Sequence, residues 1–175
     1  AGYCDMQELL SDQPRYVPSL IADKTSSYAV FSAILAALVC RERGGGGQAV
    51  EVPMFETMVD YTMVEHLYGA TFDPPIAQMG YERIMNIERR PYKTSDGRYL
   101  TVLPYTDKNW ADFFRLAGRE EFLDDPDFET HSNRLNNSKK VYATLNDIVA
   151  TRTLNDWVEK LDAANIPVMM VKTKE

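Results

Sequence analysis

Cysteine and histidine are scarce in this sequence, and their scarcity excludes several kinds of site. The chain has two cysteines, Cys4 and Cys40, and two histidines, His66 and His131. Their spacing matches no zinc motif, and two cysteines cannot build a disulfide framework. We therefore expect no metal site. Cys40 lies in an apolar segment, where a free thiol is usually a small buried residue. A soluble protein in a reducing, cytoplasmic setting fits this cysteine usage.

The chain also lacks clusters of basic residues and a long apolar run. Its net charge is −7, and its Lys and Arg residues are scattered apart from the pairs at 89–90 and 139–140. Binding to nucleic acid phosphates needs such clusters, so nucleic acid is excluded as the main partner. The longest apolar stretch, residues 28–40, is too short to span a bilayer. We therefore expect no membrane partner either.

What the sequence does contain is a long apolar segment with helical spacing, residues 20–43. Tyr28, Phe31 and Leu35 follow the helical period, and alanines fill much of the rest. Because little of the segment is polar, we expect this helix to be buried on most sides. The four glycines at 44–47 predict a structural turn rather than a phosphate-binding loop. A Walker loop would follow a strand and continue into Lys and Ser or Thr, and this run does neither.

The pattern of the remaining elements predicts two domains. Residues 70–90 show no strong periodicity and read as a long loop, in which we place the boundary. Residues 1–75 hold a helix, a short strand at 49–52 and a second helix from 53 to about 66, as in part of an α/β layer. Residues 76–175 hold a hairpin around Asp96-Gly97, three helices and a terminal strand, which is a smaller α+β domain. The predicted fold class is α/β, in a chain expected to be incomplete at both ends.

Asp23 is the candidate catalytic residue, and its neighbours leave its role open. It stands at the start of the apolar helix, where an aspartate commonly caps the helix. Thr25, Ser26 and Ser27 could cap the helix instead and leave the Asp23 carboxylate free. A carboxylate near a helix N-terminus keeps its negative charge, which a carboxylate nucleophile needs. His66 could be a general base but more often would be structural at a helix end.

Three segments then resemble one protein family in the right order. They are VPSLIADKTSSYAVFSAILAALVCRERGGGGQAVEVPMFE at 17–56, RRPYKTSDGRYLTVLPYTDKNWADFF at 89–114 and RTLNDWVEKLDAANIPVMMV at 152–171, with DDPDF at 124–128 between the last two. The first contains an aspartate, an alanine-rich helix, an arginine, a glycine-rich turn ending in glutamine and a Val-x-Val-x-Met run. Together they resemble class III CoA-transferases and the related α-methylacyl-CoA racemases.

The resemblance implies a fold, a chemistry and a set of partners. It implies an interlocked homodimer with a large α/β domain and a small α+β domain. In the transferases, the aspartate that matches Asp23 attacks an acyl-CoA thioester and forms a mixed anhydride and then an enzyme–CoA thioester. The substrates would be an acyl-CoA and a carboxylate acceptor, with coenzyme A as substrate and no permanently bound cofactor. In the racemases, the matching aspartate is instead a base at the α-carbon of a 2-methylacyl-CoA.

Departures from the family pattern limit what the resemblance implies. The family often has glycine a few residues after the aspartate, where this chain has Ser26-Ser27. The family's first half, which supplies most CoA-binding residues, has no counterpart here, so no CoA-binding residue is predicted. We expect this chain alone to bind CoA poorly and to be inactive. A hypothesis of another class is a non-catalytic dimerisation fragment in which Asp23 is only a cap.

Overall fold

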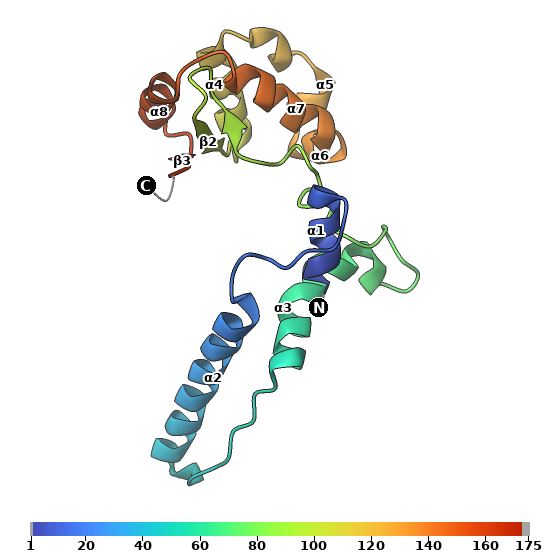
Figure 1. Ribbon diagram of the computed structural model, residues 1–175, viewed down its shortest axis with the longest axis vertical. Coiled ribbons are helices and arrows are strands. Elements are labelled where there is room, and N and C mark those ends of the chain that lie inside the picture. Colours follow the sequence, from blue (N-terminus) through green and yellow to red (C-terminus); the bar gives the residue numbers. More distant parts are fainter. Residues whose placement is uncertain (1, 173–175) are drawn as a thin grey trace. The chain divides into compact units, whose positions relative to one another are not determined.

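The computed structural model describes residues 2–172, without the side chains of residues 9 and 10, and it contains two compact units (Figure 1). Unit 1 is Ala1–Tyr81 and unit 2 is Glu82–Glu175. The two units meet between residues 81 and 82, inside the irregular segment 70–90. Mixed helices and a small sheet agree with the predicted fold class.

The regular elements of unit 1, among its described residues, are all helices or helical turns. Its elements are α1 (Tyr3–Ser11), α2 (Ile21–Cys40), a π-type turn (Arg41–Gly45), α3 (Met54–Leu67) and a 3₁₀ turn (Tyr68–Thr71). Helices α2 and α3 pack against each other. The predicted end of the apolar helix is confirmed, because Gly44 has a φ of +89° and glycine adopts this left-handed backbone without strain.

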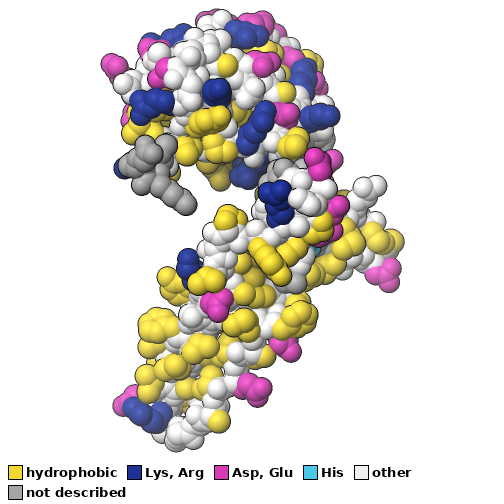
Figure 2. Space-filling model, in the orientation of Figure 1, with side chains coloured by type: hydrophobic (Ala, Val, Ile, Leu, Met, Phe, Trp, Pro, Cys, Tyr) yellow, Lys and Arg dark blue, Asp and Glu magenta, His cyan; other side chains and the backbone are white. Residues whose placement is uncertain are grey.

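Two expectations for unit 1 are wrong. The segment 49–52 is extended but forms no strand, because no other strand in the described part of unit 1 pairs with its backbone groups. Helix α2 is also far more exposed than its composition predicts: the side chains of Tyr28 and Phe31 are 75% and 60% accessible. Helix α3 packs on one side of α2, and Figure 2 shows hydrophobic side chains spread over the surface of α2.

Unit 2 is built on a three-stranded antiparallel sheet covered by helices. Its strands β1 (Tyr92–Lys93), β2 (Tyr99–Val102) and β3 (Val168–Met170) are ordered β1-β2-β3. Leu100 of β2 pairs with Tyr92 on one side and Met170 on the other. The predicted hairpin and terminal strand are confirmed. Its helical elements are α4 (Asp107–Ala117), a 3₁₀ turn (Glu120–Leu123), α5 (Pro126–Glu129), α6 (His131–Asn136), α7 (Ser138–Val149) and α8 (Leu154–Ala163).

The core of unit 2 gathers the apolar faces of its helices on the sheet. Phe113 of α4 and Trp157 of α8 are fully buried and stack with ring centroids 5.8 Å apart. Helix α8 begins where the sequence predicts, because the Thr153 hydroxyl accepts a hydrogen bond from the amide of Asp156. The core residues are Tyr92, Leu100, Val102, Trp110, Phe113, Phe114, Phe128, Val141, Tyr142, Leu145, Ile148, Val149, Leu154, Trp157, Leu161 and Ile166.

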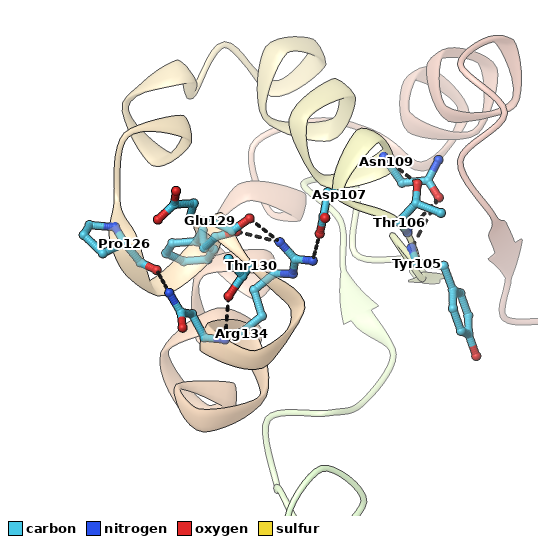
Figure 3. A network of polar contacts seen from close by, with 10 residues as sticks. Tyr105, Thr106, Asp107, Asn109, Pro126, Glu129, Thr130 and Arg134 are labelled. Carbon is cyan, nitrogen blue, oxygen red and sulfur yellow. Dashed lines mark hydrogen bonds and ion pairs between the residues drawn. The ribbon is translucent and has the colours of Figure 1, made fainter.

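A buried arginine ties α4 to the α5–α6 segment (Figure 3). The Arg134 guanidinium donates hydrogen bonds to the carbonyl oxygens of Phe128 at 2.7 Å and Glu129 at 3.3 Å, and it pairs with Asp107 at the start of α4. It also lies over the Trp110 ring, 5.5 Å from the ring centroid. A buried charge with this many partners is structural, since its donors are directed at the protein itself.

Candidate active site

Asp23 is the third residue of α2, and it does not cap the helix. The N-cap is Leu20, and no side chain makes a capping hydrogen bond there, so the capping interpretation of Asp23 is wrong. Thr25, Ser26 and Ser27 do not cap the helix either, because all of them lie inside it. The Ser27 hydroxyl instead donates to the carbonyl oxygen of Asp23 at 2.7 Å.

The Asp23 carboxylate is exposed and sits in the first turn of the helix. Among the described residues, no ion pair or hydrogen bond to its side-chain oxygens is recorded; neighbouring Lys24 donates to Ser19 Oγ at 3.3 Å instead. The unpaired amides of a first turn create positive potential that stabilises an anion. A charged carboxylate with no protein partner is available to react with a ligand.

Asp23 lines a pocket of about 590 Å³ between α1, the segment 16–20 and the start of α2. We call it the Asp23 pocket. The other residues of its lining are mostly apolar: Tyr3, Cys4, Tyr16, Val17, Pro18, Ser19, Leu20, Ile21 and Ala22. Asp23 is the one charged side chain in this described lining. A volume of this order suits a small-molecule ligand or part of a larger one.

A second pocket, of about 640 Å³, lies on the α3 side of the same wall, and we call it the α3 pocket. It shares four lining residues with the Asp23 pocket and adds residues from α3. Its lining is Gly2, Tyr3, Cys4, Ile21, Ala22, Met54, Phe55 and Met58. No charged side chain contributes to this described lining. The pocket that contains the Asp23 carboxylate therefore adjoins an apolar pocket with which it shares four lining residues.

Helix α1 forms the wall between the pockets because two contacts fix it to α3. Gly2 lies against the His66 ring so closely that a Cβ there would stand 1.8 Å from Cε1. Burial raises the pKa of the Tyr3 hydroxyl above its ordinary value. The negative charges of Tyr61 and Glu65 also raise this pKa, whereas an interaction with the Thr62 side chain lowers it. Tyr3 thus directs its hydroxyl at α3 and its ring at both pockets.

His66 shows no chemistry of its own in this arrangement. Its Nε2 is buried without a hydrogen-bond partner among the described residues, and its ring serves as the surface on which Gly2 packs. His66 does not line either pocket, so the structure does not bring it together with Asp23. Ser26, one turn beyond Asp23, is also buried with an unpartnered hydroxyl and lies outside both linings.

The remaining candidates lie in unit 2 and offer less. His131 is exposed and lines a pocket of only about 40 Å³. Arg89 and Arg90 line a pocket of about 220 Å³, where Arg90 pairs with Glu88 at 3.2 Å. Within residues 2–172, no group of three or more potential metal-ligating side chains occurs. Over the same residues, no helix is both long and apolar enough to cross a bilayer.

Sequence reasoning missed every pocket residue that precedes Leu20. No element is predicted above for residues 1–19, yet Tyr3–Ser11 is helical. The spacing of Tyr3, Met6 and Leu10 at i, i+3 and i+7 is the signal that could have identified this helix. No local pattern could show that Tyr3 and Cys4 line the same pockets as Asp23, because that contact depends on packing against α3.

Comparisons with known proteins agree on one family. The model of CoA-transferase family III matches residues 1–175. A protein named "Probable fatty acyl-CoA transferase Rv3272" from Mycobacterium tuberculosis is 27% identical over 171 residues, which cover 92% of this chain and 43% of that protein. A formyl-CoA:oxalate CoA-transferase of Streptomyces avermitilis is 29% identical over 174 residues, covering 89% of this chain and 42% of that protein.

The fold agrees as well. The orthorhombic crystal structure of Rv3272 superimposes with a TM-score of 0.72 at 25% identity, covering 93% of this chain and 42% of that one. The chain thus spans well under half the length of the relatives it matches.

Proposed function

The chain belongs to CoA-transferase family III, and we propose from this premise that Asp23 is the nucleophile that moves CoA from an acyl-CoA to a carboxylate. One observation carries the proposal. Asp23 is a charged side chain at a helix N-terminus, without a recorded partner among the described residues, on the wall of a pocket that is otherwise apolar. The first-turn amides favour the negative charge of this carboxylate, and a carboxylate nucleophile must attack as the anion.

The proposed reaction proceeds through three covalent states of Asp23. A carboxylate oxygen of Asp23 attacks the thioester carbonyl, the C–S bond breaks, and CoA leaves as its thiolate from a mixed anhydride. The thiolate attacks the Asp23 carbonyl of that anhydride, which releases the first acid and leaves an Asp23–CoA thioester. The acceptor carboxylate attacks this thioester to form a second anhydride and release the thiolate again. Attack of the thiolate on the acceptor carbonyl yields the new acyl-CoA and free Asp23.

The chain's own residues support two of these steps. The amides of the first turn of α2 stabilise the Asp23 anion before the first attack, and they would stabilise it again when the second anhydride releases it. The reaction needs no permanent cofactor, since CoA enters and leaves as part of the substrates.

The named relatives favour a transferase over a 2-methylacyl-CoA racemase, because both curated relatives described above are named CoA-transferases. The hypothesis of a non-catalytic dimerisation fragment loses its main support, because Asp23 has no capping role to explain its presence.

We further propose that the working enzyme is a homodimer whose additional segments cover α2. Apolar side chains exposed on α2, such as Tyr28 and Phe31, are of the kind that an interface buries. The chain alone, which matches about 43% of a relative, would be inactive because its CoA-binding residues lie outside it. The cytoplasmic setting stays a prediction that rests on cysteine usage; Cys4 and Cys40 are both free thiols.

The proposal is tested with Asp23→Asn in the whole protein that contains this chain. Asparagine keeps the shape of the side chain and removes the nucleophile, and no cap is lost. We expect the rate of CoA transfer from an acyl-CoA to a carboxylate to fall at least ~10³-fold, as when other enzymes lose their nucleophile. The circular dichroism spectrum should not change. Exchange of the α-proton with deuterated water, without transfer, would instead identify a racemase. Full transfer activity in the variant would refute the role of Asp23.

A further inference from the structure

The α3 pocket is placed to receive whatever is attached to the carbonyl that Asp23 attacks. It shares Tyr3, Cys4, Ile21 and Ala22 with the Asp23 pocket, so one wall serves both spaces. Ala22 directly precedes Asp23 in the helix, and its small side chain leaves room beside the carboxylate. The lining of the α3 pocket therefore reaches the residue next to Asp23, although Asp23 itself lines only the Asp23 pocket.

The lining of the α3 pocket is suited to an uncharged chain. Met54, Phe55 and Met58 form its α3 side. Methionine and phenylalanine present polarisable, apolar surface, and methionine adapts its shape to flexible ligands. The Tyr3 hydroxyl engages Thr62 rather than the pocket.

Among the residues that the structure describes, no Lys or Arg side chain lines the α3 pocket, so none there can pair with a negative group. Lys24, the basic residue next to Asp23, donates to Ser19 Oγ, and Ser19 belongs to the Asp23 pocket alone. A carboxylate buried in the α3 pocket would lose its hydration without gaining a counter-charge, which is costly. The Asp23 carboxylate itself would repel it. The lining thus discriminates between acyl groups by the charge at their far end.

The volume of the α3 pocket also fits a chain of appreciable length. Its 640 Å³ lies within the roughly 300–1,000 Å³ range of small-molecule sites. A short acyl group would leave most of the lining in contact with water. A longer aliphatic chain would fill the space and gain affinity with each methylene that it buries.

We propose that the α3 pocket binds the aliphatic tail of the acyl group, so that the enzyme selects acyl-CoAs with an uncharged chain over those that end in a carboxylate. This inference rests on the proposed function of Asp23 and adds a substrate class to it. Phe55 is its specificity-determining residue: its side chain lines the pocket and is 69% exposed, so it can be replaced without disturbing a core.

The test is an acyl-chain series measured with the whole protein. The kcat/KM for straight-chain donors from butyryl-CoA to decanoyl-CoA should rise about fourfold per methylene until the pocket is full. Hexanoyl-CoA should exceed adipoyl-CoA, of equal chain length but with a terminal carboxylate, by at least ~10²-fold. The same series is measured as binding to Asp23→Asn by calorimetry, which reads the chain-length dependence without turnover.

Two Phe55 variants and a matched control complete the experiment. Phe55→Ala should flatten the chain-length dependence, and Phe55→Lys should narrow or reverse the preference for hexanoyl-CoA over adipoyl-CoA. The controls are Val64→Ala and Val64→Lys, on the same helix, 74% exposed and outside both pockets. They should keep the wild-type profile.

The outcomes separate this inference from the proposed function. Any of three results would overturn the acyl pocket even if transfer depends on Asp23. They are turnover and binding that do not change with acyl-chain length, a preference of the wild type for adipoyl-CoA, and equal effects of Phe55→Lys and Val64→Lys. Chain-length-dependent binding that Phe55→Ala abolishes would support the pocket even if Asp23→Asn kept full activity and so refuted the nucleophile.

Discussion

Replacing Arg134 with methionine tests which contacts hold α4 to the α5–α6 segment of unit 2. The guanidinium side chain is 5% exposed and its Nη1 donates to the carbonyl oxygens of Phe128 and Glu129. Hydrogen bonds from a buried charged group contribute about 1.5–3 kcal/mol each, the longer one less. The ion pair with Asp107 should add only about 0–1 kcal/mol, because the Asp107 side chain is 72% exposed. Arg134→Met should therefore cost about 2–4 kcal/mol, and Asp107→Asn less than about 1 kcal/mol.

Urea unfolding followed by tryptophan fluorescence measures these costs in unit 2 selectively, because both tryptophans, Trp110 and Trp157, lie there. Arg134→Lys should fall between wild type and Arg134→Met, since a single ammonium cannot reproduce the planar fork of the guanidinium. The cost of Arg134→Met should persist at about 1 M salt, where exposed ion pairs are screened. If Asp107→Asn cost as much as Arg134→Met, and both costs shrank at high salt, the ion pair would dominate and the reasoning would be wrong.

Two further predictions concern backbone and charge. Gly2→Ala should destabilise unit 1 by about 2–4 kcal/mol, because the alanine would be strained in the left-handed backbone and would collide with the His66 ring. In a His66→Ala background, urea unfolding followed by circular dichroism should show that the cost of Gly2→Ala falls to about 1 kcal/mol. An unchanged cost would show that Gly2 and His66 are not in contact. The pKa of Asp96 is lowered, chiefly by the hydrogen bond from the Thr94 hydroxyl and also by that from the Leu154 amide. The stability that this lowering provides is present above the unfolded pKa of about 3.8 and is lost as the pH falls through the lower folded pKa. The unfolding midpoint of wild type should thus exceed that of Asp96→Asn at pH near 7 and converge on it in acid, and a pH-independent difference would contradict this account.

The sequence predicts unit 2 well because its signals are local. Trp110, Phe113 and Phe114 are spaced i, i+3 and i+4 and are all buried, and Asp96-Gly97 makes the tight turn of the hairpin. The Thr153 cap is read from the residue type and its spacing to Asp156. The short helices α5 and α6 were not predicted, because each has too few residues for a period to register.

Unit 1 shows where such signals fail. The apolar composition of α2 correctly predicts a helix and wrongly predicts its burial, since burial depends on which surfaces reach it. Alternation at Val50 and Val52 predicts a strand, but a strand needs a partner for its backbone groups. Four possible capping residues near Asp23 suggested a cap, yet the helix starts before all of them. Asp23 could be singled out from the family motif, whereas the pockets beside it follow from tertiary packing alone.

Peptide mass spectrometry of the whole protein after incubation with an acyl-CoA tests the central claim most directly. The account predicts a covalent acyl or CoA adduct on the peptide that contains Asp23, and loss of that adduct in Asp23→Ala. The helix should tolerate this change, because Asp23 makes no capping hydrogen bond. An adduct retained at full yield in Asp23→Ala, or an adduct on another residue of an active enzyme, would contradict the account.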